Sequence, residues 1–254
     1  MPANLKVRGV SAQYHNVETG ILAVLANVSF SIMPGQFVCL VGPSGCGKST
    51  LVRIIAGLQP PARGTVLIDD EPVKGPARQV AIMFQDANLM PWRSVIDNVA
   101  LPLEIDGQPR HERYAAARAL LPRLGLTGFE KAYPGELSGG MAQRVALGRV
   151  LIQQPALLLL DEPFGALDAM TREQVSADLL RAWEQGGQTI LMITHDINEA
   201  VWLADRVMVM SQRPGRIISD VLVDLPRPRT LEMIYSPRFG AIAAQVRGLI
   251  ERPH

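Results

Sequence analysis

The feature that most constrains this chain is a glycine-rich run between a short apolar stretch and a helical pattern. The run reads Gly42-Pro43-Ser44-Gly45-Cys46-Gly47-Lys48-Ser49-Thr50. Glycines let such a backbone curl with its N–H groups pointing inward, where they can surround phosphate oxygens. Lys48 would place a positive charge on the β- and γ-phosphates, and Ser49 would ligate Mg²⁺. The run therefore predicts a binding loop for a nucleoside triphosphate.

The residues on both sides of this loop have the pattern that the motif requires. Residues 37–41 read as a short buried strand, and Leu51, Ile54, Ile55 and Leu58 are apolar at helical spacing. A helix N-terminus after the loop adds partial positive charge for an anion. A plain glycine-rich turn between a strand and a helix is the alternative, and this context argues against it.

The overall composition limits the class of protein. With 254 residues, the chain is long enough for one large α/β domain or for a domain with an inserted subdomain. The 25 basic and 24 acidic residues leave a net charge of +1, which argues against a nucleic-acid partner. The two cysteines, one in the apolar strand and one in the glycine loop, are poorly placed for a disulfide and favour a reducing cytosol.

No stretch of the sequence has the pattern of a signal peptide or of a membrane span. The longest apolar stretches, residues 21–33 and 145–160, are interrupted by Asn, Ser, Arg, Gln and Pro. We therefore expect a soluble chain whose role at a membrane depends on a partner.

Strand signals in the first and last thirds of the chain flank a helical middle. Antiparallel strands are expected at 5–14, 21–33 and on both sides of 69–71. A further strand is expected at 80–84, and parallel strands buried on both faces, apolar without alternation, are expected at 156–160, 189–194 and 206–210. Helices are expected after Ser94 with its capping partner Asp97, at 110–124, and at 238–251 in the tail.

A second motif that suits phosphate binding is an apolar strand that ends in two carboxylate residues. The expected strand at 156–160 runs directly into Asp161 and Glu162. Asp161 would lie at the carboxyl edge of an open α/β sheet, where ligands bind, and would hold Mg²⁺. Glu162 is placed to orient or deprotonate an attacking water. The alternative is a strand that ends in two solvated acids.

A third element is the run Ser138-Gly139-Gly140, which opens a predicted helix within residues 137–144. A hydroxyl and free N–H groups at the positive end of a helix can bind an anion. By itself such a run is more often a simple turn at a helix start, but here it lies between the phosphate loop and the acidic strand.

Together these motifs resemble those of the ATP-binding subunits of ABC transporters, over nearly the whole chain. Residues 42–50 match the family's Walker A, 137–143 its signature loop, and 157–162 its Walker B. The resemblance implies a P-loop NTPase of the α/β class, with a RecA-like parallel core, an antiparallel β subdomain and an inserted α-helical subdomain. The expected boundaries are 1–86 and 152–225 for the core with its antiparallel part, 87–151 for the helical subdomain, and 226–254 for a helical tail.

Four single residues extend the resemblance. Gln85 matches the Q-loop glutamine, Asp168 the D-loop aspartate, and His195 the switch histidine that senses the γ-phosphate. Tyr14 matches the aromatic residue that stacks on adenine, and a plain strand tyrosine is the alternative. Asp196 and Glu199 read as the capping pair of the helix after His195, which leaves the imidazole free. A packed histidine is the alternative there.

The resemblance also implies a mechanism and partners. Two copies would clasp ATP between them, with the Walker A residues of one copy facing Ser138, Gly139 and Gly140 of the other. Mg²⁺ would be held by Ser49, Gln85 and Asp161, and Glu162 would polarise the water. The subunit would sit at the cytoplasmic face of the cell (inner) membrane through transmembrane permease subunits, and would act indirectly with a solute-binding protein.

A finer resemblance is to importer ATPases for nitrate, sulfonates, taurine and similar small solutes. It rests on Gly75-Pro76, on Met90-Pro91-Trp92-Arg93 and on Arg213-Pro214-Gly215-Arg216-Ile217. In the family, the zone after Gln85 receives a short helix of the membrane subunit, so Trp92 is expected at that contact, with a core position as the alternative. One departure is Met141-Ala142, where many relatives have two glutamines; it changes the helix flank and leaves the anion site intact.

The main rival is a soluble ABC-type ATPase without transport. Translation factors of this kind fuse two such domains, and repair proteins insert long coiled coils, neither of which this sequence has. An iron–sulfur assembly type remains open. A P-loop kinase or GTPase does not require the signature run or His195, and a dinucleotide-binding loop would need a third glycine at a different spacing.

Overall fold

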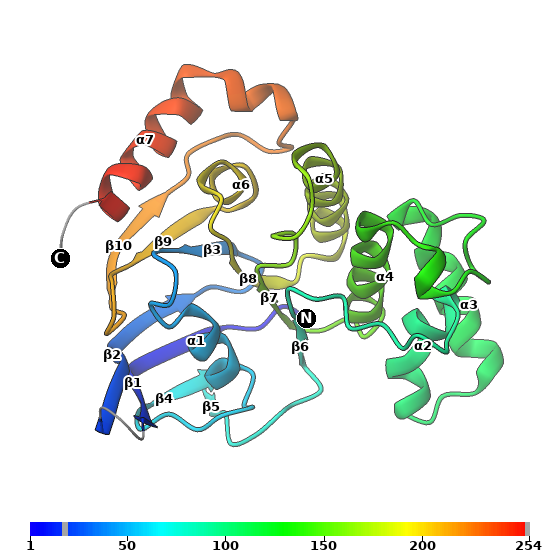
Figure 1. Ribbon diagram of the computed structural model, residues 1–254, viewed down its shortest axis with the longest axis horizontal. Helices are drawn as coiled ribbons and strands as arrows, with labels where there is room; N and C mark the ends of the chain where they lie inside the picture. The colour runs from blue at the N-terminus through cyan, green and yellow to red at the C-terminus, as the bar shows by residue number, and fades with distance from the viewer. Residues whose placement is uncertain (17–19, 252–254) are drawn as a thin grey trace.

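The computed structural model describes residues 1–16 and 20–251, and its strands form two sheets (Figure 1). The larger sheet has the order β10 (Ile217–Leu222), β9 (Arg206–Met210), β3 (Phe37–Val41), β8 (Thr189–Ile193), β7 (Leu157–Asp161) and β6 (Val80–Met83). Its strands are parallel except for β10, which pairs antiparallel with β9. The smaller sheet is antiparallel, with the order β2 (Gly20–Ile32), β1 (Leu5–Asn16), β4 (Arg63–Ile68) and β5 (Glu71–Pro72).

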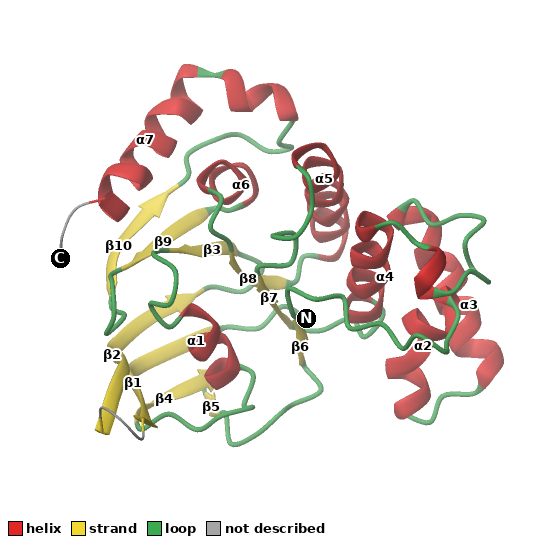
Figure 2. Ribbon diagram, viewed as in Figure 1, coloured by secondary structure: helices red, strands yellow, loops and turns green. Residues whose placement is uncertain are grey.

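Helices cover the larger sheet on both faces (Figures 1 and 2). α1 (Lys48–Ile55) lies between the two sheets, and α5 (Ala169–Gly186), α6 (Ile197–Leu203) and α7 (Pro237–Glu251) lie on the opposite face. Every residue of β3, β7 and β8 is buried. Along β3, Phe37 and Cys39 pack toward α5 and α6, whereas Val38 and Leu40 pack toward α1. Burial on both faces explains why these strands are apolar without alternation.

A group of helices extends from the parallel sheet at one end of the molecule (Figure 1). It comprises α2 (Val95–Ile105), α3 (Arg110–Leu120), η1 (Leu121–Leu124), η2 (Pro134–Glu136) and α4 (Gly139–Leu151). A hydrophobic cluster runs from the sheet into this group through residues such as Val99 of α2 and Leu147 of α4. These helices fall within the segment 87–151 that we propose as an inserted subdomain.

The α/β class with a parallel core, an antiparallel sheet and added helices is as the sequence predicts, and the differences have local causes. The helix expected over 110–124 changes to a 3₁₀ turn at Leu121, because Pro122 has no N–H for a helical hydrogen bond. β10 is not among the expected strands; it is an edge strand of which only Val221 is buried, and its residues therefore give no clear apolar pattern. Cys39 and Cys46 are both buried and free. Within residues 1–16 and 20–251, no helix is both long and apolar enough to cross a membrane.

Candidate nucleotide-binding site

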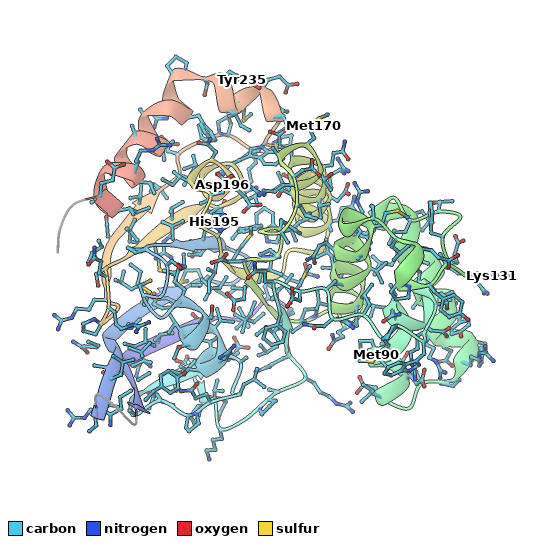
Figure 3. All side chains as sticks on the ribbon, in the orientation of Figure 1. Met90, Lys131, Met170, His195, Asp196 and Tyr235 are labelled. Carbon is cyan, nitrogen blue, oxygen red and sulfur yellow. The ribbon has the colours of Figure 1, made fainter. Side chains whose placement is uncertain are left out.

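The predicted phosphate chemistry lies at the carboxyl ends of three neighbouring strands. Residues 42–50 follow β3, Asp161 ends β7, and His195 comes shortly after β8, which lies between the other two strands. Parallel strands present their carboxyl ends at one edge of a sheet, where ligands of α/β proteins bind. His195 and Asp196 accordingly lie near the middle of the molecule (Figure 3).

A cavity of about 690 Å³ lies at the other edge of the same sheet. Its walls include Gln154 and Pro155, which precede β7, and Gln188, which precedes β8. This cavity is therefore separate from the predicted phosphate site, which lies at the carboxyl edge.

The glycine loop curls around the side chain of Lys48. The ammonium Nζ donates to the carbonyl oxygens of Gly42 at 2.8 Å and Pro43 at 2.9 Å, and the residue is only 6% exposed. Gly45 and Gly47 have φ angles of 72° and 111°, a left-handed region that suits glycine. A Cβ on Gly47 would also lie 2.7 Å from a methyl carbon of Leu25. The loop conformation thus depends on glycine at both positions.

A hydroxyl and a carboxylate meet where the loop enters α1. Ser49 Oγ donates to Asp161 Oδ1 at 3.0 Å. Burial raises the pKa of Asp161, and the hydrogen bond from Ser49 opposes that rise. Both groups offer oxygen atoms, the ligands that Mg²⁺ prefers, and within the described residues no cluster of His, Cys, Asp and Glu side chains forms a complete cage for a metal ion. The donor set fits Mg²⁺ shared between a few protein ligands and phosphate oxygens.

Glu162 and His195 form a pair beside this site. His195 Nδ1 lies 3.0 Å from Glu162 Oε2, and the two side chains are 55% and 26% exposed. Glu162 has a left-handed φ of 47°, a conformation that costs a non-glycine residue on the order of 1 kcal/mol. Its N–H donates to the carbonyl of Ile193 at 3.0 Å, which holds the residue at the end of β8. The carboxylate and the imidazole are therefore placed together at an accessible edge.

Gln85 reaches the same region from the end of β6. A Cβ built on Gly165 would lie 3.6 Å from Gln85 Nε2 and 3.5 Å from His195 Cε1, so both side chains border that glycine. The backbone carbonyl of Gln85 accepts a hydrogen bond of 2.7 Å from Gln143 Nε2 in α4. This bond ties the Gln85 segment to the helix that follows the Ser-Gly-Gly run.

The Ser-Gly-Gly run and Asp168 form the starts of two neighbouring helices. Ser138 caps α4 and accepts the Met141 N–H at 3.3 Å, and Asp168 caps α5 and accepts the Thr171 N–H at 3.0 Å. Hydrogen bonds from the Thr171 side chain and from its N–H group lower the pKa of Asp168. A Cβ on Gly140 would lie 2.3 Å from Thr171 Cγ2, so the two helix starts are in contact. In the described part of the chain, these caps bond within their own helices and do not reach residues 42–50.

Tyr14 lies on β1 beside α1. Its hydroxyl donates to Gln59 Oε1 at 2.9 Å and lies 3.3 Å from Thr50 Oγ1, while the residue is 39% exposed. The hydroxyl group is therefore held by the protein, and the ring is partly accessible to a flat ligand.

Glu199 differs from its expected role as a cap. Asp196 caps α6 by accepting the N–H groups of Asn198 and Glu199 at 2.9 and 3.1 Å, but the Glu199 side chain points into the protein. Its carboxyl accepts hydrogen bonds from Ser176 at 2.8 Å and Thr194 at 2.5 Å. Burial raises the pKa of Glu199. No sequence signal separates a capping glutamate from a buried one at this spacing.

Arg172 is a second structural residue of the site that the sequence analysis missed. Its guanidinium donates to the carbonyls of Phe164 at 3.3 Å and Leu167 at 2.8 Å, and to Asp196 Oδ2 at 3.3 Å. It therefore ties the turn before Asp168 to the residue after His195. In the sequence, an arginine four residues after Asp168 gives no signal of such a contact.

Comparisons with known proteins agree with this geometry. The family model described as ABC transporter matches residues 25–165. The chain is 46% identical over 214 residues to the taurine import ATP-binding protein TauB of Yersinia pestis, covering 84% of this chain and 82% of that protein. It is 43% identical over 219 residues to the aliphatic sulfonates import ATP-binding protein SsuB of Bacillus cereus, covering 86% of each.

A solved structure has the same fold. It is the dimeric, post-hydrolysis state of the ATP-binding cassette MJ0796 bound to ADP and Pi, with a TM-score of 0.77 and 32% identity, covering 87% of this chain and 100% of that one. The fold, the arrangement of the motifs and these similarities agree. The chain therefore belongs to the ABC transporter family, and it is an ABC ATPase, an ATP-binding subunit that hydrolyses ATP to power transport.

Proposed function

We propose that residues 42–50, Asp161, Glu162, Gln85 and His195 form the ATPase site, and that the subunit powers the import of a small solute. The observation that carries the first part is the placement of two pairs, Ser49 with Asp161 and Glu162 with His195, at one edge of the sheet. Phosphoryl transfer needs positioning and charge neutralisation more than covalent chemistry, and these groups are of the types that do both.

The phosphate loop would bind the triphosphate through its backbone N–H groups, with Gly42 to Thr50 curled around the phosphates. Lys48 would exchange its bonds to two loop carbonyls for the β- and γ-phosphate oxygens. The N-terminus of α1 adds partial positive charge at the same place. Tyr14, beside α1 with a partly accessible ring, would stack on the adenine.

The residues around Ser49 fit Mg²⁺, as their oxygen ligands indicate. Ser49 and Asp161 would hold the ion, with Gln85 completing the protein ligands. When bound, Mg²⁺ neutralises charge on the β- and γ-phosphate oxygens. Asp161 must be ionised for this, and the cation offsets the effect of burial that raises the pKa of its carboxyl.

Glu162 would accept a proton from the attacking water, and His195 would contact the γ-phosphate. The 3.0 Å contact between Glu162 and His195 supports this, because it holds both groups toward the same space. Loss of one well-placed group of this kind lowers kcat about 10²- to 10³-fold.

The experiment that tests this assignment is Glu162→Gln, an isosteric change that removes the base. We expect ATP binding at wild-type affinity and almost no hydrolysis, measured by nucleotide titration and phosphate release. Glu173→Gln is a matched control on α5, outside the site. Near-normal turnover of the Glu162 variant would remove this residue from the proposed role.

A second copy of the chain would complete the site. Ser138, Gly139, Gly140 and Asp168 carry anion-binding or capping groups, yet in the described residues they lie apart from the phosphate loop of their own chain. Face-to-face pairing would bring the Ser138 helix start of one copy over the γ-phosphate held by the other. The dimeric structure of MJ0796, to which this chain is similar, supports such pairing.

The proposal of an importer for taurine, a sulfonate, nitrate or a similar solute rests on the named relatives, which import taurine and aliphatic sulfonates. Permease subunits would hold the chain at the cytoplasmic face of the membrane, and a solute-binding protein would act through them. Trp92, which is 71% exposed on the helical side of the molecule, is proposed at the permease contact. A core role for this side chain does not fit that exposure.

The named relatives, which are import ATP-binding proteins, argue against the iron–sulfur assembly type that the sequence left open. Co-purification distinguishes the two functions: a permease should be retained with the tagged subunit in detergent, and reconstituted vesicles should take up one of these solutes when ATP is supplied. Retention of a soluble assembly protein, with no permease, would favour the alternative.

A further inference from the structure

The turn between β9 and β10 packs against the outer side of the phosphate loop. Gly215 is held to β2, because its N–H donates to the Val24 carbonyl at 2.8 Å and its carbonyl accepts the Ala26 N–H at 3.0 Å. A Cβ on Gly215 would lie 2.3 Å from the carbonyl oxygen of Cys46 in the loop. This turn is therefore in direct backbone contact with the loop.

The turn is also braced from within. Ser211 Oγ accepts the N–H of Arg216 at 3.0 Å, and the Ser211 N–H donates to the Arg216 carbonyl at 2.9 Å. These bonds close the turn on which Arg213 lies. Because the backbone of the turn is fixed in this way, the Cα of Arg213 has a defined position relative to the phosphate loop.

Arg213 makes the polar contact from this turn to the phosphate loop. Its Nε and Nη2 atoms donate to the carbonyl oxygen of Gly45 at 3.0 and 2.6 Å. A bond from an ionised donor is stronger than a neutral one, and two donors on one oxygen fix its direction. A Cβ on Gly45 would lie 3.3 Å from Arg213 Nη2, so the guanidinium lies directly on this part of the loop.

The direction of that carbonyl decides the direction of the next N–H. In a planar trans peptide, the C=O of one residue and the N–H of the next point to opposite sides. Because the Gly45 oxygen is held outward by Arg213, the Cys46 N–H points away from Arg213. Gly45, with its φ of 72°, has enough conformational freedom for this peptide to take other orientations if it is released.

We propose that Arg213 is a positioning residue for phosphate binding, which holds the Gly45–Cys46 peptide with its N–H group toward the bound phosphates. The positively charged guanidinium of Arg213, which donates to the Gly45 oxygen, also polarises this peptide and strengthens the Cys46 N–H as a donor. Arg213 acts through the loop and touches no reacting atom. This inference rests on the proposed function of residues 42–50 as the phosphate-binding loop.

The test compares Arg213→Ala, Arg213→Lys and Arg216→Ala in the full-length protein. Arg216 is an exposed arginine on the same turn, so its variant controls for the loss of a positive charge there. The probe is a fluorescent ADP analogue with Mg²⁺, and steady-state ATP hydrolysis separates KM from kcat. Thermal unfolding without nucleotide reports on the fold.

For Arg213→Ala we expect nucleotide affinity to fall, and KM for ATP to rise, by about three- to tenfold, the effect of one charge-assisted hydrogen bond. The kcat at saturation should stay within about twofold, because the loop is reordered once ATP is bound. Arg213→Lys, which keeps the charge with a single donor atom, should lie between Arg213→Ala and the wild type. Arg216→Ala should bind as the wild type does.

Two results would overturn the proposal. They are wild-type affinity in Arg213→Ala, whether or not its unfolding temperature drops, and an equal loss of affinity in Arg216→Ala. A Lys48→Ala variant tests the assumption that residues 42–50 bind phosphate independently of the role of Arg213. If Lys48→Ala also binds the ADP analogue normally, the assignment of the loop itself fails. If Lys48→Ala loses binding and Arg213→Ala does not, only the role of Arg213 fails.

Discussion

At the residue scale, two buried carboxyl groups have different roles: one is proposed to bind the metal ion, and the other supports the fold around the site. Asp161 and Glu199 both have pKa values raised by burial. Asp161 opens onto Ser49 at the edge where Mg²⁺ would bind, and a cation would favour its ionised form. Glu199 instead receives two hydroxyl hydrogen bonds, from Ser176 in α5 and from Thr194 next to His195. Glu199 therefore supports the backbone that positions His195.

The raised pKa of Glu199 predicts how its contribution to stability changes with pH. A free glutamic acid has a pKa of about 4.3, and the folded state holds this proton more tightly. The stability that protonated Glu199 contributes is complete below the unfolded pKa and is lost as pH rises through the folded pKa. Glu199→Gln stays uncharged, so its stability relative to the wild type should increase with pH over that window and then level off.

Urea unfolding of both proteins at matched pH values measures this difference, which cancels the effects of the other carboxyl groups. Glu199→Ala is the matched control: it leaves two buried hydroxyls without their acceptor and should lose about 1–3 kcal/mol. A Gln-to-wild-type difference that does not change with pH would contradict the prediction.

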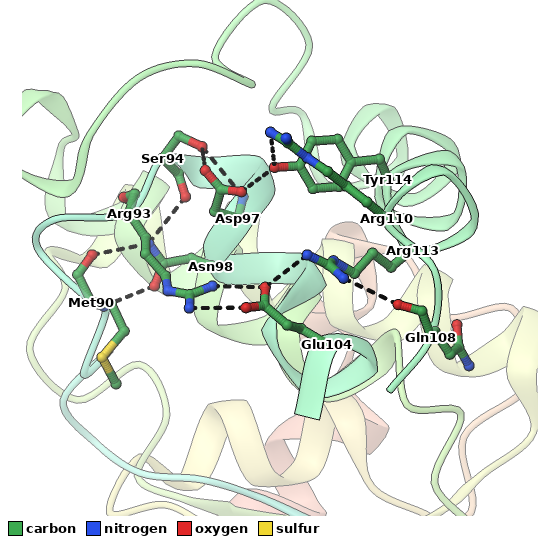
Figure 4. Close-up of polar contacts among 10 residues, drawn as sticks. All are labelled: Met90, Arg93, Ser94, Asp97, Asn98, Glu104, Gln108, Arg110, Arg113 and Tyr114. Atoms are coloured by element: carbon green, nitrogen blue, oxygen red, sulfur yellow. Dashed lines mark hydrogen bonds and ion pairs between the residues drawn. The ribbon is translucent and has the colours of Figure 1, made fainter. Parts of the chain in front are cut away.

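At the element scale, the backbone of the segment before α2 is hydrogen-bonded to a side chain of α2, while Trp92 in the same segment is exposed. Asn98, fully buried in α2, accepts the Met90 N–H at 2.8 Å and donates to the carbonyls of Met90 and Arg93 at 3.2 and 3.0 Å (Figure 4). Arg93 in turn makes two bonds to Glu104, at 2.9 and 3.2 Å. The loop that carries Trp92 is thus rigid, while the indole itself is exposed.

A rigid loop with an exposed aromatic side chain suits a docking contact, because little conformational entropy is lost on binding. We predict that Trp92→Ala lowers retention of the permease and solute-stimulated ATPase activity, but leaves basal ATP hydrolysis and unfolding temperature unchanged. Ile105→Ala at the other end of α2 is the control, since Ile105 is 77% exposed in the same group of helices. Equal retention of the permease by the Trp92 and Ile105 variants would argue against this contact.

The C-terminal segment stabilises the end of α6 through one buried arginine. Arg229 is buried and donates to the carbonyls of Val201, Trp202 and Ala204 at 2.8, 3.0 and 2.6 Å, so it satisfies the C-terminal end of the helix that follows His195. Burial lowers the pKa of Arg229 to about 10. The segment that carries Arg229 therefore supports the helix that follows His195.

At the scale of the whole molecule, the two halves of the proposed ATP site lie on different parts of one chain. The phosphate loop lies between the sheets, whereas Ser138 and Asp168 lie where α4 meets α5 (Figure 1). A γ-phosphate held by the loop would have one side uncovered in a single copy. In the proposed dimer, the helix start at Ser138 of a second copy would cover that side.

Pairing through Ser138 can be tested in the Glu162→Gln background, where bound ATP persists. We predict that Glu162→Gln forms an ATP-dependent dimer, and that adding Ser138→Arg abolishes the dimer while ATP binding to the monomer remains. Size-exclusion chromatography with light scattering and nucleotide titration measure the two properties. Gln108→Arg, which places the same side chain at an exposed site on the helical side, should dimerise normally. A dimer that survives Ser138→Arg would remove this contact from the interface.

The sequence by itself determined those elements whose functional residues are neighbours along the chain. A phosphate loop needs neighbouring residues with particular backbone freedom, so residues 42–50 are recognisable before any folding is known. The same holds for the apolar strand ending in Asp161 and for the helix starts at Ser94 and Ser138, which the structure contains at those positions.

Only the tertiary structure decided which distant residues support these elements. Arg213 reaches Gly45 across 168 positions, and Gln143 reaches the Gln85 carbonyl across 58. Glu199 has the spacing of a capping residue, yet packing of α5 against α6 turns it inward to Ser176. Such contacts are set by the three-dimensional packing of strands and helices, and hydrogen-bonding side chains carry no periodic pattern that reveals a partner far along the chain.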